Sequence, residues 1–291
     1  MKSLRRLPTW KKILLTVLLL CSAELAAFAL GHLLFGNRLT VTKYARADVR
    51  FTQPVRVVQL SDLHGRCFGP QNADLVAAAA EQAPDLIFLT GDIFSYGSTD
   101  ELETALRLVS DLSGLAPVYY SLGNHEADHL RQFGPAFLDD LTAAGAQILE
   151  LSYVDTEVRG QPLRIGGAYG YLLTENYRNG PEQTFMKEFT DTDRPCLLLS
   201  HLSQGLLAYH CIYGWDLTAA FCGHSHGGQI RLPLLGGLYD PELNWFPQYS
   251  KGMFLMNNAA IILSAGLGSG NRAPRLNNPP ELVVMDFLPL H

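Results

Sequence analysis

The sequence lacks the cysteine spacing of a metal–thiolate site or a disulfide framework. Its 291 residues include five cysteines, an odd number, and no two of them form a Cys-x-x-Cys pair. A disulfide framework usually has an even number of cysteines, and zinc–thiolate sites use Cys-x-x-Cys spacing. We therefore predict neither kind of structure for Cys21, Cys67, Cys196, Cys211 and Cys222.

Positive charge is also scarce outside the first residues. The net charge is −6, although the first twelve residues carry five Lys and Arg and no acid. Without this +5 the rest of the chain carries −11. Nucleic-acid phosphates require basic surface, so we expect no nucleic-acid partner. With 47% hydrophobic and 17% charged residues, the chain can bury the core of one large domain.

One long apolar run lies near the N-terminus. Residues 13–35, ILLTVLLLCSAELAAFALGHLLF, would extend about 34 Å as a helix, enough to cross a bilayer core. Glu24 costs roughly 3 kcal/mol at mid-bilayer, but the leucines around it return about 0.3–0.6 kcal/mol each. We interpret residues 13–35 as a transmembrane anchor. A cleaved signal peptide is the alternative, because Ala27-Phe28-Ala29 fits a small-x-small processing site.

The charges around this run predict an orientation. A basic segment at 1–12 favours a cytoplasmic N-terminus, which makes the protein single-pass with its catalytic domain on the extracytoplasmic side. Basic residues after the run weaken the asymmetry. Residues 36–54 are polar and irregular, and we interpret them as a linker to a globular domain over 55–291.

In that domain, apolar strands alternate with helices, which predicts a largely parallel α/β sheet. The predicted helices cover 72–82, 99–112 (with Ser98 or Thr99 as its N-cap and Gly114 beyond its end) and 135–144. The main predicted strands cover 55–60, 85–90, 117–122, 196–200 and 218–222. Short alternating strands are expected near 147–153 and 163–168. Strand-like runs at 252–256, 260–264 and 282–287 suggest a second sheet packed on the first. We expect residues 169–180 to loop over the site.

Acids and histidines follow the ends of these strands. After the run VRVVQL the chain reads Ser61-Asp62-Leu63-His64-Gly65. Because side chains two apart in extended chain point the same way, Asp62 and His64 could share a metal ion. The carboxyl ends of parallel strands meet at one edge of a sheet. The other blocks at this edge are Gly91-Asp92, Gly123-Asn124-His125-Glu126, Ser200-His201 and Gly223-His224-Ser225-His226.

These acids, amides and histidines are more than one metal needs. Two divalent ions that share a bridging carboxylate would satisfy them, and such pairs lie roughly 3.5–4 Å apart and promote phosphoryl transfer. Oxygen and imidazole ligands without thiolate favour Mn, Fe or Zn.

The ordered blocks DLH, GD, GNHE, SH and GHSH resemble the signature of the calcineurin-like metallophosphoesterases. The resemblance implies a four-layer α/β/β/α sandwich with a dinuclear metal site. It implies hydrolysis of phosphate ester or diphosphate bonds by a hydroxide held between two metals. His125 resembles the residue that stabilises phosphoryl oxygens or protonates the leaving group. The implied ligands are Asp62, His64 and His226 for the first metal, Asp92 as the bridge, and Asn124, His201 and His224 for the second.

The C-terminal stretch from Gly266, GLGSGNRAPRLNNPPELVVMDF, is similar to the YkuE-like phosphoesterases, a subgroup with an N-terminal membrane segment. Its arginines, Arg272 and Arg275, could bind a substrate phosphate. Tethering makes lipid-linked phosphates attractive substrates. Some relatives of the subgroup cleave UDP-2,3-diacylglucosamine, which is made in the cytoplasm and out of reach of an outward-facing domain.

Two other functions compete with a phosphoesterase. A non-catalytic scaffold of the same fold would typically lose ligands or the catalytic histidine, whereas this chain retains every one. A nuclease is disfavoured by the acidic domain and the anchor. Two roles are considered for Glu126: it could orient His125, or it could form an ion pair with a basic residue.

Overall fold

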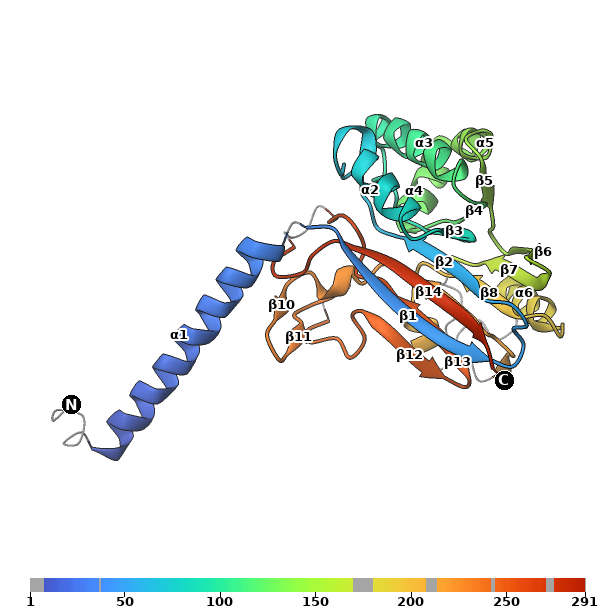
Figure 1. Ribbon diagram of the computed structural model, residues 1–291. Helices are drawn as coiled ribbons and strands as arrows, with labels where there is room; N and C mark the ends of the chain where they lie inside the picture. Colours follow the sequence, from blue (N-terminus) through green and yellow to red (C-terminus); the bar gives the residue numbers. More distant parts are fainter. Residues whose placement is uncertain are drawn as a thin grey trace.

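Two six-stranded sheets lie face to face, with helices outside each sheet (Figure 1). The computed structural model describes residues 8–36, 38–169, 180–207, 214–241, 244–270 and 275–290. The strand order is β1-β14-β2-β3-β4-β5 in the first sheet and β12-β13-β9-β8-β7-β6 in the second. This arrangement confirms the four-layer α/β/β/α sandwich.

Four parallel strands make up most of the first sheet, and β14 runs antiparallel to β2. Its strands are β1 (Thr40–Asp48), β2 (Val55–Leu60), β3 (Leu86–Thr90), β4 (Val118–Ser121), β5 (Ala146–Ile148) and β14 (Glu281–Pro289). The helices on its outer side are α2 (Ala73–Ala80), α3 (Thr99–Ser113), α4 (Asn124–Phe133) and α5 (Ala136–Ala143). The predicted cap of α3 is confirmed, because the Ser98 hydroxyl accepts a hydrogen bond from the Glu101 N–H.

The second sheet carries fewer helices. Its strands are β6 (Ser152–Val158), β7 (Gln161–Gly167), β8 (Cys196–Leu199), β9 (Ala219–Cys222), β12 (Gly252–Met256) and β13 (Ala259–Leu263). The remaining elements of this half are α6 (Pro181–Thr190), α7 (Gln204–Leu207), the short 3-10 turn η5 (His226–Gly228) and the small hairpin of β10 (Arg231–Leu232) and β11 (Gly236–Gly237).

Three apolar cores separate the four layers. All five residues of β3 are buried, and its side chains alternate between two of these cores. Ile87 and Leu89 face the helices of the first sheet, whereas Leu86 and Phe88 lie between the sheets. A third core lies between the second sheet and α6. Burial on both faces explains why β3 reads as a continuous apolar run in the sequence.

The prediction of an irregular linker over 36–54 is wrong for its central part. Residues Thr40–Asp48 form β1, which pairs with β14 along its whole length, from Thr40 opposite Glu281 to Asp48 opposite Pro289. Alternate β1 side chains are partly buried and exposed. Such an edge strand needs few apolar residues, and polar contacts such as the hydrogen bond from Thr42 Oγ1 to Glu281 Oε1 (2.5 Å) fix it instead.

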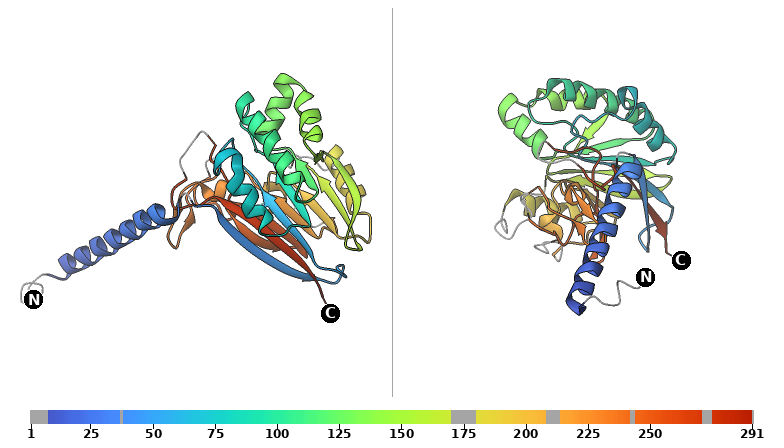
Figure 2. Two further views of the ribbon diagram at one scale, coloured as in Figure 1. Left: turned by 45° about the horizontal axis from the view of Figure 1, so that its top comes forward. Right: turned by 90° about the vertical axis from the view of Figure 1, so that its left-hand side faces the viewer.

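The helix α1 (Thr9–Phe35) projects away from the sandwich (Figures 1 and 2). Its stretch Thr9–Leu33 is long and apolar enough to cross a membrane, and its most apolar part buries nothing against the rest of the chain. Where α1 meets the body, His32 Nδ1 accepts a hydrogen bond from the Asn277 N–H (3.3 Å). The predicted loop at 169–180 falls largely on residues 170–179, outside the described residues.

Candidate dinuclear metal centre

The candidate ligands lie in turns that follow strands of both sheets. Asp62 and His64 follow β2 and Asp92 follows β3 in the first sheet. In the second sheet, His201 follows β8, and the loop that holds His224 and His226 follows β9. The site therefore spans the edge where the two sheets meet.

Asp62 and His64 were expected to point the same way from extended chain, but the backbone there is not extended. The strand ends at Leu60, and both residues lie in a turn rather than in extended chain. The turn is held by hydrogen bonds from the Asp62 and His64 N–H groups to the Gly91 and Asp92 carbonyls (both 3.0 Å). Five candidate ligands have left-handed φ angles between 46° and 69°, a conformation that costs non-glycine residues about 1–3 kcal/mol each and clusters at functional sites. They are Asp62, His64, Asp92, His224 and His226.

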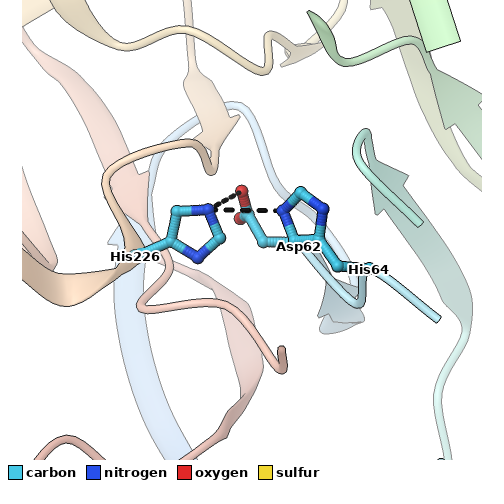
Figure 3. A group of neighbouring side chains, drawn as sticks. All are labelled: Asp62, His64 and His226. Atoms are coloured by element: carbon cyan, nitrogen blue, oxygen red, sulfur yellow. Dashed lines mark hydrogen bonds and ion pairs between the residues drawn. The ribbon is translucent and has the colours of Figure 1, made fainter. Parts of the chain in front are cut away.

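The first group of ligands comprises Asp62, His64 and His226, whose ligating atoms lie within 4.8 Å of one another (Figure 3). The Nε2 atoms of the two histidines are 3.3 Å apart, and His226 Nε2 lies 3.6 Å from Asp62 Oδ1. The His224 N–H donates to both Asp62 carboxylate oxygens, at 2.9 and 3.1 Å. All three side chains are buried.

The second group comprises Asp92, His201 and His224, again within 4.8 Å. The Nδ1–H of His201 donates to the Thr90 carbonyl (2.7 Å). This bond turns the Nε2 atom of His201 toward Asp92 Oδ2, 3.3 Å away. Asn124 Oδ1 lies 3.2 Å from the same Nε2 atom.

Asp92 lies between the two groups. Its Oδ2 atom is 3.7 Å from His64 Nε2 in the first group and 3.3 Å from His201 Nε2 in the second. Its Oδ1 atom accepts a hydrogen bond from the His125 N–H (2.8 Å). A carboxylate in this position can contribute to two cations at once.

The residues present fit two divalent cations. The Nε2 atoms of His64 and His226 face each other at 3.3 Å with Asp62 beside them, so their lone pairs point at one spot. Buried carboxylates and imidazoles that converge in this way need a positive charge between them. The structure thus brings together all seven side chains proposed from the sequence as ligands.

Burial sets the protonation of the first group. It lowers the pKa of His64 and of His226 to about 3, so both imidazoles are neutral at pH 7 and offer a lone pair. Burial also disfavours the charged form of His201, but the Asp92 carboxylate outweighs it and raises the pKa of His201 to about 10. For Asp92 itself, burial opposes ionisation, yet the charge and hydrogen bond of His201 hold its pKa well below the usual range.

His125 lies in the first turn of helix α4, at the edge of the site. Its ring packs edge-on against that of His64, with centroids 4.8 Å apart. Its Nδ1 atom accepts a hydrogen bond from the Tyr96 N–H (2.9 Å). The proton of the neutral ring is therefore on Nε2, which leaves that nitrogen as a hydrogen-bond donor.

Glu126 has a different role from both alternatives raised by the sequence. It is fully buried, and its carboxylate accepts hydrogen bonds from the Asp92, Ile93 and Gly123 N–H groups (2.8–2.9 Å). It also accepts one from the Tyr120 hydroxyl (2.6 Å). Glu126 therefore fixes the turn that presents Asp92. Its place after Asn124 and His125 was the only sequence signal, because its partners come from other strands.

Two glycines allow the backbone to approach the carboxylates. A Cβ atom at Gly123 would lie 2.3 Å from Asp92 Oδ1, and one at Gly223 would lie 2.5 Å from Asp62 Oδ2. Any side chain at these positions would displace a candidate ligand.

Arg275, predicted to contact substrate, is instead buried and structural. Its guanidinium donates to four backbone carbonyls of its own loop region, at 2.7–3.1 Å. Its N–H groups are thus bound to backbone carbonyls, and the predicted substrate-binding role of Arg275 is wrong. Arg272 lies outside the described residues.

A cavity of ≈ 220 Å³ opens beside His224. Its described lining carries no Lys or Arg, and it includes Ser203, Gln204, Asp240, Asn244 and Tyr249. It is next to the second group of ligands and large enough for part of a substrate.

Comparison with known proteins gives consistent similarities. A family model described as calcineurin-like phosphoesterase matches residues 55–228. The chain is 27% identical to phosphodiesterase YaeI of Escherichia coli, over 81% of this chain and 83% of that protein. It is 26% identical to the uncharacterized metallophosphoesterase YkuE of Bacillus subtilis, over 79% of this chain and 77% of that protein. It is 24% identical to the UDP-2,3-diacylglucosamine pyrophosphatase LpxG of Chlamydia trachomatis (80% and 84%).

Proposed function

Because the chain belongs to the calcineurin-like phosphoesterase family and is a hydrolase of phosphoester bonds, we propose that its strand-end side chains hold two divalent cations. Asp62, His64 and His226 would bind one cation, and Asn124, His201 and His224 the other. Asp92 would bind both. The oxygen and imidazole donors suit Mn, Fe or Zn.

The bound cations would supply positive charge that stabilises the phosphoryl oxygens and lowers the pKa of water. The chain itself would supply a proton donor. His125 presents Nε2–H because the Tyr96 N–H occupies Nδ1. This donor can hydrogen-bond a phosphoryl oxygen or the leaving-group oxygen as negative charge develops there.

The substrate we favour is a lipid-linked phosphodiester or diphosphate. One relative is named a phosphodiesterase, and another is named for a lipid-linked diphosphate substrate. The apolar helix α1 supports anchoring at a membrane, where such substrates lie. The basic N-terminal segment supports an extracytoplasmic catalytic domain, and a surface lipid phosphate would be within reach there.

The observation that carries the proposal is the position of Asp92 between two imidazole Nε2 atoms. We expect Asp92→Ala to lower metal content at both positions, from about two ions per chain toward none. Elemental analysis after Mn loading measures this. Asp111→Ala, at an exposed site on α3, is the matched control and should keep both ions. Two retained ions in Asp92→Ala would contradict the bridging assignment.

Activity separates the substrate classes. The Mn-loaded chain in detergent should hydrolyse at least one of three probes: a soluble phosphomonoester, a soluble phosphodiester or a nucleotide-lipid diphosphate. Failure on all three with both ions bound would favour a non-catalytic scaffold.

A further inference from the structure

The segment after the η5 turn exposes large apolar side chains. We call residues 230–241 and 244–246 the hairpin region; it contains β10 and β11. Leu234 is 97% exposed at the hairpin tip and Leu235 is 66% exposed, while Trp245 and Phe246 are 68% and 53% exposed. Four large apolar side chains exposed within one short segment are typical of a contact surface.

The hairpin region lies beside the end of α1 that meets the body (Figures 1 and 2). Asn277 connects the two. Its backbone N–H donates to His32 Nδ1 in the last turn of α1 (3.3 Å), and its side-chain amide donates to the Arg231 carbonyl in β10 (3.1 Å). If α1 spans a bilayer, the hairpin region is therefore held at the bilayer surface.

The hairpin region is also joined to the candidate metal centre. It begins directly after the turn that carries His226. The Leu238 N–H donates to the Gly228 carbonyl (3.1 Å), and the guanidinium of Arg231 donates to the Gly227 carbonyl (2.7 Å). The cavity beside His224 is lined by Asp240 and Asn244 of the same region.

We propose that the hairpin region is a second membrane-contact surface, which inserts Leu234, Leu235 and Trp245 into the lipid interface next to α1. Leucine supplies apolar area, and tryptophan is enriched at the level of lipid headgroups. A single helix leaves the attached body free to swivel, whereas two contacts fix the height of the metal centre above the lipid. The proposal rests on the membrane anchoring by α1 that we proposed above.

Tryptophan quenching in lipid tests this surface without any activity measurement. The full chain carries three tryptophans, at positions 10, 215 and 245. A W10F/W215F variant leaves Trp245 as the only tryptophan. In phosphatidylcholine vesicles with brominated acyl chains we expect Trp245 to lose most of its fluorescence relative to unbrominated vesicles.

The matched control is a W10F/W245F variant, which leaves Trp215 packed against the third core. Trp215 should keep its fluorescence in both kinds of vesicle. If neither tryptophan is quenched, the proposal is wrong. Quenching of both would also overturn it, because the body would then lie on the lipid without a specific surface. Concentration-dependent shielding of Trp245 from acrylamide, without bromine quenching, would show that a second copy covers the region.

A second pair of variants links the surface to turnover. L234D/L235D should keep the wild-type rate on soluble bis(p-nitrophenyl) phosphate but lose most of the rate on a phosphodiester carried in vesicles. L255D, at a leucine on β12 that is as exposed as Leu235, should keep both rates. Equal loss in both variants, or none in L234D/L235D, would contradict the proposal. If the wild type hydrolyses neither substrate, the proposed function fails while the quenching result still decides the surface.

Discussion

The imidazole of His125 has two functions: its Nδ1 atom accepts a hydrogen bond from the Tyr96 N–H, and its Nε2–H group can donate to substrate. In His125→Asn, the side-chain oxygen can still accept from Tyr96, but the Nε2–H donor is lost. We expect kcat to fall about 10²- to 10⁴-fold, with both ions retained. Stopped assays with parallel elemental analysis measure the two quantities.

His125→Gln is the companion variant, because its amide nitrogen can lie near the position of Nε2 while the acceptor for Tyr96 is lost. It should retain more activity than His125→Asn. Wild-type turnover in His125→Asn would remove the residue from the mechanism.

Glu126 acts on the metals only through the Asp92 turn. Glu126→Gln places an NH₂ group against backbone N–H donors, which leaves buried groups unpaired at a cost of about 1–3 kcal/mol. We expect metal affinity to fall about 10- to 100-fold, the effect typical of groups that orient ligands. Titration with Mn by calorimetry measures it. Glu103→Gln, on the exposed face of α3, should bind Mn like the wild type; an equal affinity in Glu126→Gln would make the carboxylate purely structural.

At this scale, the sequence predicted which residue types gather but not how they are held. The seven proposed ligands could be named because each follows an apolar strand or resembles a family block. Their left-handed φ angles and the role of Glu126 depend on neighbouring turns that no local pattern encodes. Arg275 was misassigned because a loop rich in Gly, Pro and Asn predicts exposure, whereas the carbonyls of that loop bury its guanidinium.

The strand β1 determines where the folded domain begins. A chain of residues 51–291 would lack β1 and leave the outer edge of β14 unpaired along nine residues, with only β2 on its other side. We expect it to unfold at a clearly lower temperature than residues 38–291 and to aggregate, because an unpaired long strand edge is adhesive. The free energy of unfolding should fall by on the order of several kcal/mol, because apolar area on β14 becomes exposed. Differential scanning calorimetry and light scattering compare the two; equal melting temperatures would show that β1 contributes nothing.

Elements with strong periodic patterns were predicted well. Helix α3, expected at 99–112, covers Thr99–Ser113, because it combines an amphipathic pattern with a Ser98 cap. Helix α4 was missed, since its sequence NHEADHLRQF begins with site residues and carries few apolar positions. The strands of the hairpin region, two residues each, are too short to have a periodic signal.

For the molecule as a whole, the histidines predict how the metal-free protein responds to pH. The pKa of His64 and of His226 is about 3 in the folded chain, against an ordinary value near 6.5. The unfolded chain therefore binds more protons below pH 6.5, and stability falls as the pH decreases from there toward 3. The pKa of His201 is raised to about 10, so its contribution is complete below pH 6.5 and is lost as the pH rises toward 10.

These histidines favour a stability maximum of the metal-free protein near pH 6.5. Burial raises the pKa of Glu150 to about 7, and this carboxyl makes the fall in stability below pH 6.5 shallower. Urea unfolding midpoints between pH 4 and 9 measure this. His201→Asn should flatten the alkaline fall and leave the acid fall in place. A midpoint that rises steadily from pH 6 to 9 in the wild type would contradict the assignment of His201.

At the largest scale, the apolar pattern predicted a second sheet packed on the first, and the family resemblance implied their four-layer order. The assignment of residues 282–287 to the second sheet is wrong, because β14 lies in the first sheet. The strand order and register between distant segments, such as the position of β14 between β1 and β2, cannot be predicted from local sequence patterns.

The ligands come from both sheets, three from turns of the first and three histidines from turns of the second, with Asn124 at the start of α4. Two bound cations would thus link the two sheets of the sandwich to each other. Removing the cations with a chelator should then weaken the packing of the two sheets against each other. A variant that weakens this packing should in turn release the ions, even when every ligand is intact. In such a molecule, metal retention would report on the integrity of the whole interface.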